Sequence, residues 1–115
     1  MIMMNKKDYL IVEAKVKAVN GSVYHEALKD RSRLELELQD NDFGVKRVRV
    51  AGMLPIEAGD VVRIGFEKSV RAGHYSDGPR YKNRTIDDLK NDACADVVEK
   101  LKGGNVVATY RNFWD

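Results

Sequence analysis

Residues 33–50 read RLELELQDNDFGVKRVRV, and this stretch decides the fold class. Leucine occupies every second position from Leu34 to Leu38 with glutamate between, which is the period of a strand that buries one face. The alternation resumes within Val45–Val50, after a polar turn in which Gly44 suits a positive φ angle. The stretch therefore predicts a β-hairpin.

Similar alternation precedes and follows this hairpin. Residues 9–19 alternate apolar and polar side chains, and residues 62–66 place Val, Ile and Phe at every second position. Residues 20–32 begin with an Asn-Gly-Ser turn signal and predict a long polar loop, or a loop with a short helical turn over residues 24–28. A short connection with a Gly-Asp turn spans residues 54–60. We predict a meander of four strands that must close or pair its edges.

Length and composition favour one domain over residues 1–115. The chain is 43% hydrophobic and 33% charged, which is enough for one globular core with a densely charged surface. We expect the core in residues 9–70. Residues 71–84 have no sustained apolar period, so they predict a long loop or a hairpin with its tip at residues 76–79. A helix and a strand are expected in residues 85–115.

Apolar residues recur at helical spacing in this C-terminal part. With Gly103-Gly104 as a stop signal, they predict a helix over at least Asp92–Lys102. Thr85 and Asp88 resemble a capping box before that helix. Val106–Phe113 has the composition of a last strand.

Charge and cysteine content exclude several classes of protein. The net charge is only +2, so a nucleic-acid site would depend on local clusters of cations. A single cysteine, Cys94, excludes an internal disulfide and a cysteine-only metal cage. No apolar run approaches the roughly 18–20 residues of a membrane span, and no signal-peptide core is present. We expect a cytoplasmic protein, or a nuclear one if its source has a nucleus, without membrane association.

The order of the predicted elements resembles an OB-fold domain, particularly those of replication-protein-A-like single-stranded-DNA-binding proteins. The resemblance covers about residues 9–70. It is carried by Leu34-Glu35-Leu36-Glu37-Leu38-Gln39-Asp40, Gly44, Val48-Arg49-Val50 and Ala58-Gly59-Asp60-Val61-Val62-Arg63-Ile64-Gly65. It implies a mainly β, five-stranded OB-type barrel, here with an additional C-terminal helix. An OB fold commonly places its helix between strands three and four, whereas the predicted helix follows strand four. Strand five is then either residues 80–89 or residues 106–113.

The segment after the fourth strand combines cations with aromatic rings. Its members are Arg71, His74, Tyr75, Arg80, Tyr81, Lys82 and Arg84. Lysine and arginine neutralise phosphates, and aromatic faces stack on unpaired bases for about 1–3 kcal/mol each. The resemblance implies that this segment borders the binding face. We predict binding of single-stranded nucleic acid, DNA before RNA, with low sequence specificity; the alternative is a solvated loop with ordinary surface charges.

Arg47 and Arg49 form a second candidate surface, with Arg63 on the next strand. The resemblance places the ligand over strands two and three, where these arginines face outward. The alternative is that Glu35 and Glu37 across the hairpin hold the arginines in ion pairs, worth roughly 0.2–1 kcal/mol each.

Other side chains can extend such a groove. Lys15 and Lys17 on the first strand, with Tyr24 and His25 after it, are either part of it or plain surface residues. Tyr9 either stacks on a base or packs against the barrel rim.

No catalytic residue, bound metal or cofactor is predicted, so the chain is not expected to be an enzyme. HExxH, Walker-type and GxSxG patterns are all missing from the sequence. Asp87 and Asp88 suit a helix start, and Asp40 and Asp42 a turn. Cys94 is interpreted as a small core residue on or near the predicted helix.

The rival interpretation is an OB-type protein-interaction subunit or adaptor that does not bind nucleic acid. It would use the predicted helix around Val97 and Leu101, for a protein partner or for self-association. The C-terminal Phe113-Trp114-Asp115 either docks in a partner or folds back over the barrel. The low net charge favours this rival.

Overall fold

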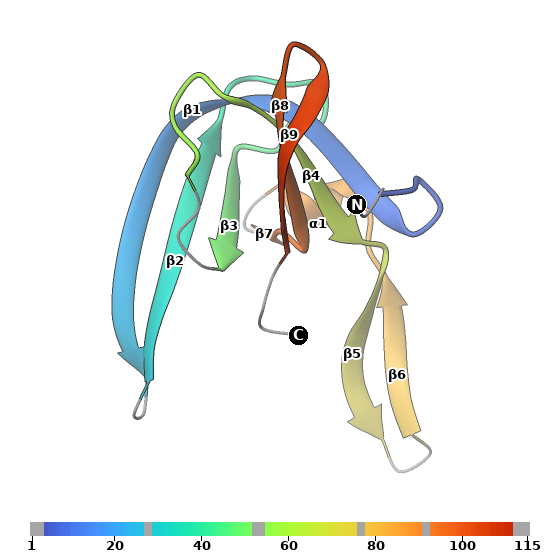
Figure 1. Ribbon diagram of the computed structural model, residues 1–115. Coiled ribbons are helices and arrows are strands. Elements are labelled where there is room, and N and C mark those ends of the chain that lie inside the picture. The colour runs from blue at the N-terminus through green and yellow to red at the C-terminus, as the bar shows by residue number, and fades with distance from the viewer. Residues whose placement is uncertain (1–3, 27–28, 52–54, 76–77, 91–92, 112–115) are drawn as a thin grey trace.

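The computed structural model describes residues 4–26, 29–51, 55–75, 78–90 and 93–111, and within these ranges it describes only the backbone of residues 22–33, 51 and 71–80. The protein is mainly β, as predicted (Figure 1). The described elements are β1 (Tyr9–Glu26), β2 (Lys29–Leu38), β3 (Arg47–Ala51), β4 (Val61–Glu67), β5 (Ser69–Tyr75), β6 (Gly78–Asn83), α1 (Ile86–Leu89), β7 (Ala93–Cys94), β8 (Val97–Lys102) and β9 (Asn105–Arg111).

Seven of these strands form one sheet in the order β7-β3-β2-β1-β4-β8-β9, and β5 and β6 form a separate two-stranded sheet. The seven-stranded sheet is not closed into a barrel. Its strands β7 and β8 are nevertheless consecutive in the chain, joined by Ala95 and Asp96. The Ala95 N–H donates to the carbonyl of Arg49 in β3 at 2.8 Å, and the Asp96 N–H donates to that of Gly65 in β4 at 3.0 Å. The chain therefore crosses from β3 to β4 at this joint.

Strand β1 pairs with two neighbours in succession. Tyr9–Lys15 pairs with β4, and Val16–Glu26 pairs with β2. The register shifts between Val16 and Ala18, the type of irregularity that bends a strand. The bend lets one strand belong to both halves of the sheet.

The prediction of a long loop over residues 20–32 is wrong. Residues 20–26 continue β1, and residues 29–32 continue β2 in antiparallel register with them, so the predicted helical turn is excluded for residues 24–26. Residues 27 and 28 lie outside the described part of the chain. Backbone hydrogen bonds between the two strands hold this polar arm together. Because the arm consists mostly of polar residues, its sequence shows no apolar alternation from which the strands could be predicted.

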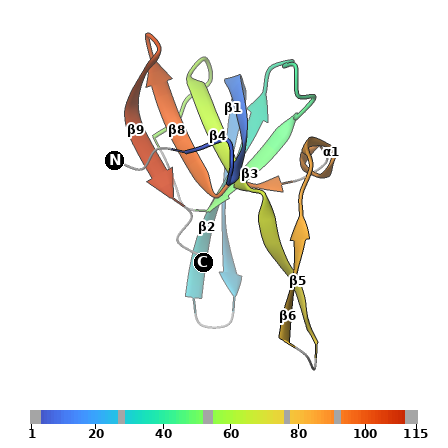
Figure 2. The same ribbon diagram turned by 90° about the vertical axis from the view of Figure 1, so that its right-hand side faces the viewer.

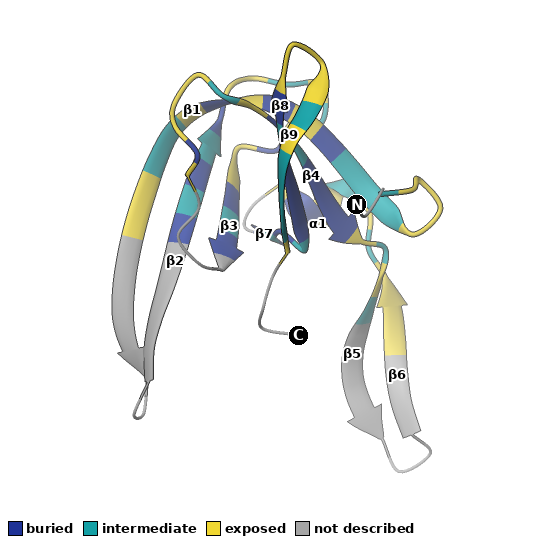
Figure 3. Ribbon diagram, viewed as in Figure 1, coloured by how far each residue is buried: buried dark blue, intermediate teal, exposed yellow. Residues whose placement is uncertain are grey.

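The predicted inward faces of the strands form the core (Figure 3). The largest fully buried side chains are Phe66, Leu36, Ile64, Leu89, Val12, Val16, Val45, Val48, Val62 and Val98. Gly44 has a φ angle of 70°, as its turn position requires. The alternation therefore predicted the packing of β2, β3, β4 and of β1 as far as Val16 correctly. Beyond the register shift, Val19 packs against the core, whereas the alternation had predicted Ala18 there.

The predicted helix over Asp92–Lys102 is wrong. Ala93–Cys94 is β7 and Val97–Lys102 is β8, while the described helix is the short α1 before them. In β8, Val97, Val98, Glu99 and Leu101 are all buried, so both faces of the strand are covered. A strand buried on both faces has no period-two alternation and can resemble a buried helix.

The Gly103-Gly104 pair, predicted to stop this helix, turns the chain between β8 and β9. Its φ angles are 60° and 82°, which suit the turn of a β-hairpin. The predicted last strand is confirmed through Arg111 as β9; residues 112–113 lie outside the described part. The strand beside β4 is β8, so neither predicted alternative for strand five occupies that position.

Strands β5 and β6 pair as an antiparallel hairpin, which confirms the hairpin alternative for the segment after β4. Of the predicted tip at residues 76–79, Gly78 and Pro79 are paired in β6, and residues 76–77 lie outside the described part. In both views the β5–β6 hairpin and the β1–β2 arm extend from the same side of the body (Figures 1 and 2). The turn between β8 and β9 lies at the opposite end.

Candidate nucleic-acid interface

The β5–β6 hairpin gathers the predicted basic and aromatic residues on two paired strands. Arg71 stands opposite Tyr81 in the register, and Gly73 stands opposite Arg80. The side chains of Arg71, His74, Tyr75 and Arg80 lie outside the described part of the structure. The backbone nevertheless places all four residues on the same hairpin as Tyr81 and Lys82.

Tyr81 and Lys82 are open to solvent at the base of this hairpin. Tyr81 is 66% exposed and the Lys82 side chain is 63% exposed. The Lys82 Nζ lies 4.0 Å from Asp88 Oδ1, a surface pair that contributes little to stability. The two residues are consecutive in β6, so their side chains leave opposite faces of this two-stranded ribbon. An exposed tyrosine ring can stack on a base, and an exposed lysine can contact a phosphate.

Asp88 brings a negative charge close to this pair. The backbone N–H of Thr85 donates to Asp88 Oδ2 at 2.8 Å, as the predicted capping box requires. This hydrogen bond is the main reason why the pKa of Asp88 lies below its ordinary value of 3.8, and the positive charge of Lys82 lowers the pKa further. Asp88 is therefore ionised near neutral pH and partly offsets Lys82.

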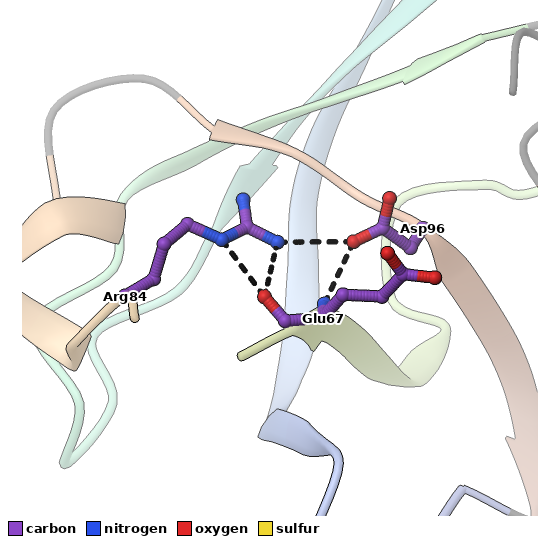
Figure 4. Close-up of polar contacts among 3 residues, drawn as sticks. All are labelled: Glu67, Arg84 and Asp96. Atoms are coloured by element: carbon purple, nitrogen blue, oxygen red, sulfur yellow. Dashed lines mark hydrogen bonds and ion pairs between the residues drawn. The ribbon is translucent and has the colours of Figure 1, made fainter. Parts of the chain in front are cut away.

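Arg84 is engaged within the protein (Figure 4). Its Nε and Nη2 donate to the backbone carbonyl of Glu67 at 2.9 and 2.7 Å, and Nη2 also donates to Asp96 Oδ2 at 3.0 Å. Its side chain is only 18% exposed, and its guanidinium lies 5.9 Å from the ring centre of Phe66. Arg84 thus anchors the base of the hairpin, and two of its three nitrogens have partners inside the protein.

The outward face of β2 and β3 carries charges of both signs. The register places Glu35 opposite Arg49 and Glu37 opposite Arg47. Arg47 is exposed, with Nε 3.9 Å from Glu35 Oε1, and Arg49 is half-buried. The ion pair weighed as an alternative is present for Arg47, so this face offers a phosphate less positive field than its arginines alone would give.

Arg63 bridges two carboxylates on neighbouring strands. Its Nη2 lies 3.3 Å from Glu13 Oε1, and its Nη1 lies 3.5 Å from Glu99 Oε1. The Glu99 side chain is only 5% exposed, so Arg63 compensates a buried charge. This arginine supports the sheet and is not a free cation for a ligand.

The β1–β2 arm holds basic residues that the sequence analysis did not single out. Lys29, Arg31 and Arg33 follow each other at alternate positions in β2, and Arg31 stands opposite Tyr24. Their side chains, with those of Tyr24 and His25, lie outside the described part. The run of alternate cations was a signal in the sequence, but assignment of Lys29 and Arg31 to a loop hid it. Lys15 and Lys17 are exposed on β1.

Three further features bear on other functions in the described residues: groups of metal-ligating side chains, the single cysteine and helices that could span a membrane. They contain no group of three or more His, Cys, Asp or Glu side chains that could hold a metal ion. Cys94 is half-buried in β7, not on a helix. Within the same described ranges, no helix is long and apolar enough to cross a membrane. The tail residues Phe113, Trp114 and Asp115 lie outside them.

Comparison with known proteins gives no family to which the chain can be assigned: no family model, no curated protein and no solved structure matches it.

Proposed function

We propose that the protein binds single-stranded nucleic acid, DNA in the first instance, with low sequence specificity. The observation that carries the proposal is the exposure of both the Tyr81 ring and the Lys82 side chain, at consecutive positions of a hairpin that pairs only with itself among the described strands. Aromatic faces stack on unpaired bases and lysines neutralise phosphates, and duplex DNA offers no free base face. Arg71, His74, Tyr75 and Arg80 on the same hairpin add cations and a second tyrosine.

The strand pairing supports an OB-type topology for this proposal. Strand β1 pairs with both β2 and β4, β3 is parallel to β7, and β4 is antiparallel to β8. Residues 93–102 would then be a fifth strand, interrupted at Ala95 and Asp96, of a partly open barrel. In an OB fold the loops after strands one and four flank the face of strands two and three that binds oligonucleotides. Here those connections are the β1–β2 arm and the β5–β6 hairpin, which extend from the same side (Figures 1 and 2).

The proposed interface differs from the full set of sequence candidates. Arg71, Arg80 and Lys82 on the hairpin are its main cations, and Lys29, Arg31 and Arg33 on the arm are added to them. Arg47 and Arg49 contribute from the mixed-charge face of β3. Arg84 is left out because its described contacts are internal.

A fluorescence-anisotropy titration of labelled single-stranded and duplex oligonucleotides at two salt concentrations tests the proposal. If four phosphates are neutralised, affinity for the single strand falls roughly 50-fold between about 50 and 200 mM salt. Tyr81→Ala weakens binding about 5- to 150-fold, the range expected for loss of one stacked base. Lys102→Gln, an exposed cation at the opposite end of the body, leaves affinity unchanged. Binding that is absent, insensitive to salt or equal for duplex contradicts the proposal.

A protein-interaction module remains the second candidate because arginines on the outer surface are already paired with carboxylates. Arg47 with Glu35, and Arg63 with Glu13, reduce the positive field over the sheet. The residues first expected to contact a partner from a helix, Val97 and Leu101, are instead buried in strand β8. Size-exclusion chromatography with light scattering, with and without oligonucleotide, separates the candidates: a stable oligomer that ignores the oligonucleotide supports this second one.

A further inference from the structure

A pocket of about 550 Å³ lies at the base of the β5–β6 hairpin, outside the residues assigned above to the interface. Three chain segments line it: residues 7–9 before and at the start of β1, residues 67–69 from the end of β4 to the start of β5, and residues 83–84 at and after the end of β6. Pockets of 300–1,000 Å³ are the usual size for small ligands. The volume is therefore sufficient for a single nucleotide.

Hydrogen bonds connect the walls of the pocket to one another without a ligand. The Lys68 N–H donates to the Asp8 carbonyl at 2.9 Å, and the Arg84 N–H donates to the Lys68 carbonyl at 2.7 Å. The Lys68 ammonium also donates to the Lys6 carbonyl, and Arg84 fixes the Glu67 carbonyl (Figure 4). Binding sites for small ligands are usually preformed in this way.

The lining combines cations with an aromatic ring. Lys7 is exposed, Lys68 is partly exposed, and Tyr9 is half-buried beside them. The Arg84 Nη1 points away from Glu67 and Asp96, so this nitrogen is not used in the contacts that anchor the hairpin (Figure 4).

Two carboxylates, Asp8 and Glu67, and two neutral polar side chains, Ser69 and Asn83, also line the pocket. The Asp8 carboxylate accepts a hydrogen bond from the Asn5 amide at 3.1 Å, and Glu67 is exposed. Because Arg84 is paired with Asp96, the lining cations that remain for an anionic group are Lys7 and Lys68. Ser69 and Asn83 add an exposed hydroxyl and an exposed amide. A ligand with one anionic group, one flat ring and several hydrogen-bonding edges fits this composition.

We infer that the pocket binds one nucleotide, with its phosphate at Lys7 and Lys68 and its base against Tyr9. The inference rests on the proposed function, since the nucleotide would belong to a strand that continues along the β5–β6 hairpin. Ser69 and Asn83 would bond the edge of the base or the sugar. A free nucleotide has the same chemistry, so the test separates the two sources.

The test is an NMR titration of the ¹⁵N-labelled protein with 2′-deoxyadenosine 5′-monophosphate, with inorganic phosphate and with a single-stranded oligonucleotide. We expect saturable shifts of the Lys68, Ser69 and Arg84 amides with the nucleotide, and weaker ones with phosphate. Lys7→Gln should weaken nucleotide binding roughly tenfold, since hydrogen bonds between charged groups are strong. Tyr9→Leu keeps an apolar side chain but removes the stacking face, and should weaken binding about fivefold or more. Lys102→Gln is the control with the same change of charge and should have no effect.

The outcomes separate the pocket from the proposed function. The pocket is a subsite for single-stranded nucleic acid if the nucleotide and the oligonucleotide both shift the pocket amides. Both variants, Lys7→Gln and Tyr9→Leu, should then reduce these shifts. If the oligonucleotide binds but leaves the pocket amides unmoved, and Lys7→Gln leaves its affinity intact, the pocket inference is overturned while the proposed function stands. If the nucleotide binds and the oligonucleotide does not, the pocket is a free-nucleotide site and the proposed function fails. If phosphate and nucleotide bind with equal affinity, and Tyr9→Leu leaves the affinity for the nucleotide unchanged, the base does not stack on the Tyr9 ring.

Discussion

At the scale of single residues, Asp96 joins two parts of the molecule through one oxygen atom. Its Oδ2 accepts the Glu67 N–H at 2.7 Å and Arg84 Nη2 at 3.0 Å. The Asp96 and Arg84 side chains are 17% and 18% exposed, so little water is available to replace these bonds. The Asp96 carboxylate thus links the connection between β7 and β8 to the end of β4 and, through Arg84, to the base of the β5–β6 hairpin.

Asp96→Asn should lower the free energy of unfolding by about 1–3 kcal/mol, because it removes the charge that Arg84 needs at a poorly solvated site. Urea denaturation measures the change. Asp87→Asn is a matched control: Asp87 pairs with Lys90 at 2.9 Å but is 84% exposed, so a change within about 0.5 kcal/mol is expected. Equal effects of the two substitutions would mean that the Asp96 contacts carry no special weight.

The pKa of Asp88 gives a prediction about pH. Because its folded-state pKa is lowered, the stabilisation that the Thr85 cap provides is present above the ordinary value of 3.8 and is lost as pH falls through the lower folded-state pKa. An NMR titration of the Asp88 carboxyl should therefore give a midpoint below 3.8, with the Thr85 amide shift following the same curve. Asp88→Asn should abolish the titration of the Thr85 amide. A midpoint at or above 3.8 would contradict the hydrogen bond.

At the scale of secondary structure, the sequence was informative wherever a strand has one buried and one exposed face. Residues 9–16, 34–38 and 62–66 have this form, and their inward residues were predicted correctly. After the register shift in β1, Val19 packs against the core in place of Ala18, which the alternation had put on the inward face. Strand β8 is covered on both faces, and the arm of β1 and β2 is polar, so neither contains the alternation on which the prediction depends. These elements are fixed by pairing with distant strands, which a local pattern does not contain.

The candidate site was predictable to a similar extent. The basic and aromatic composition of residues 71–84 located the β5–β6 hairpin, because residue types are read directly from the sequence. The partners of Arg63 and Arg84 were not predictable. Glu99 and Asp96 reach these arginines only after β8 has aligned with β4, and no local spacing encodes that alignment.

Shortening the β5–β6 hairpin should separate binding from folding. Replacing residues 72–80 with Asn-Gly joins Arg71 to Tyr81, which already pair across the hairpin, through a favourable two-residue turn. The buried core contains no residue of β5 or β6 among those described, so the urea midpoint should change little. Affinity for single-stranded DNA should fall at least roughly tenfold with the loss of Tyr75 and Arg80.

A control of unchanged length replaces Ser76-Asp77 alone with Asn-Gly. This variant should bind as the parent does, since it keeps the cations and tyrosines of both strands. Full affinity in the shortened hairpin would remove residues 72–80 from the interface, and loss of folding would show that the hairpin supports the core.

At the scale of the whole molecule, a net charge of +2 gives little long-range attraction to a polyanion. The binding proposed above therefore depends on local cations, and the proposal assigns it to the side of the body where the arm and the hairpin extend together (Figures 1 and 2). Three of the four charged residues of the β5–β6 hairpin and its turn are cations, whereas the sheet carries arginines that are paired with glutamates. The hairpin thus brings a sequence rich in cations, together with the exposed Tyr81, to a place outside the buried core.

The most direct test of this account is NMR mapping of a single-stranded oligonucleotide of about eight nucleotides, a length within the site sizes known for OB folds. At saturation, the account predicts that the largest amide shifts fall in β5, β6 and the β1–β2 arm, with smaller ones in β3. The turn between β8 and β9, at the other end of the body, should stay unmoved. Shifts centred on β8 and β9, or no shifts at a concentration that saturates binding, would contradict it.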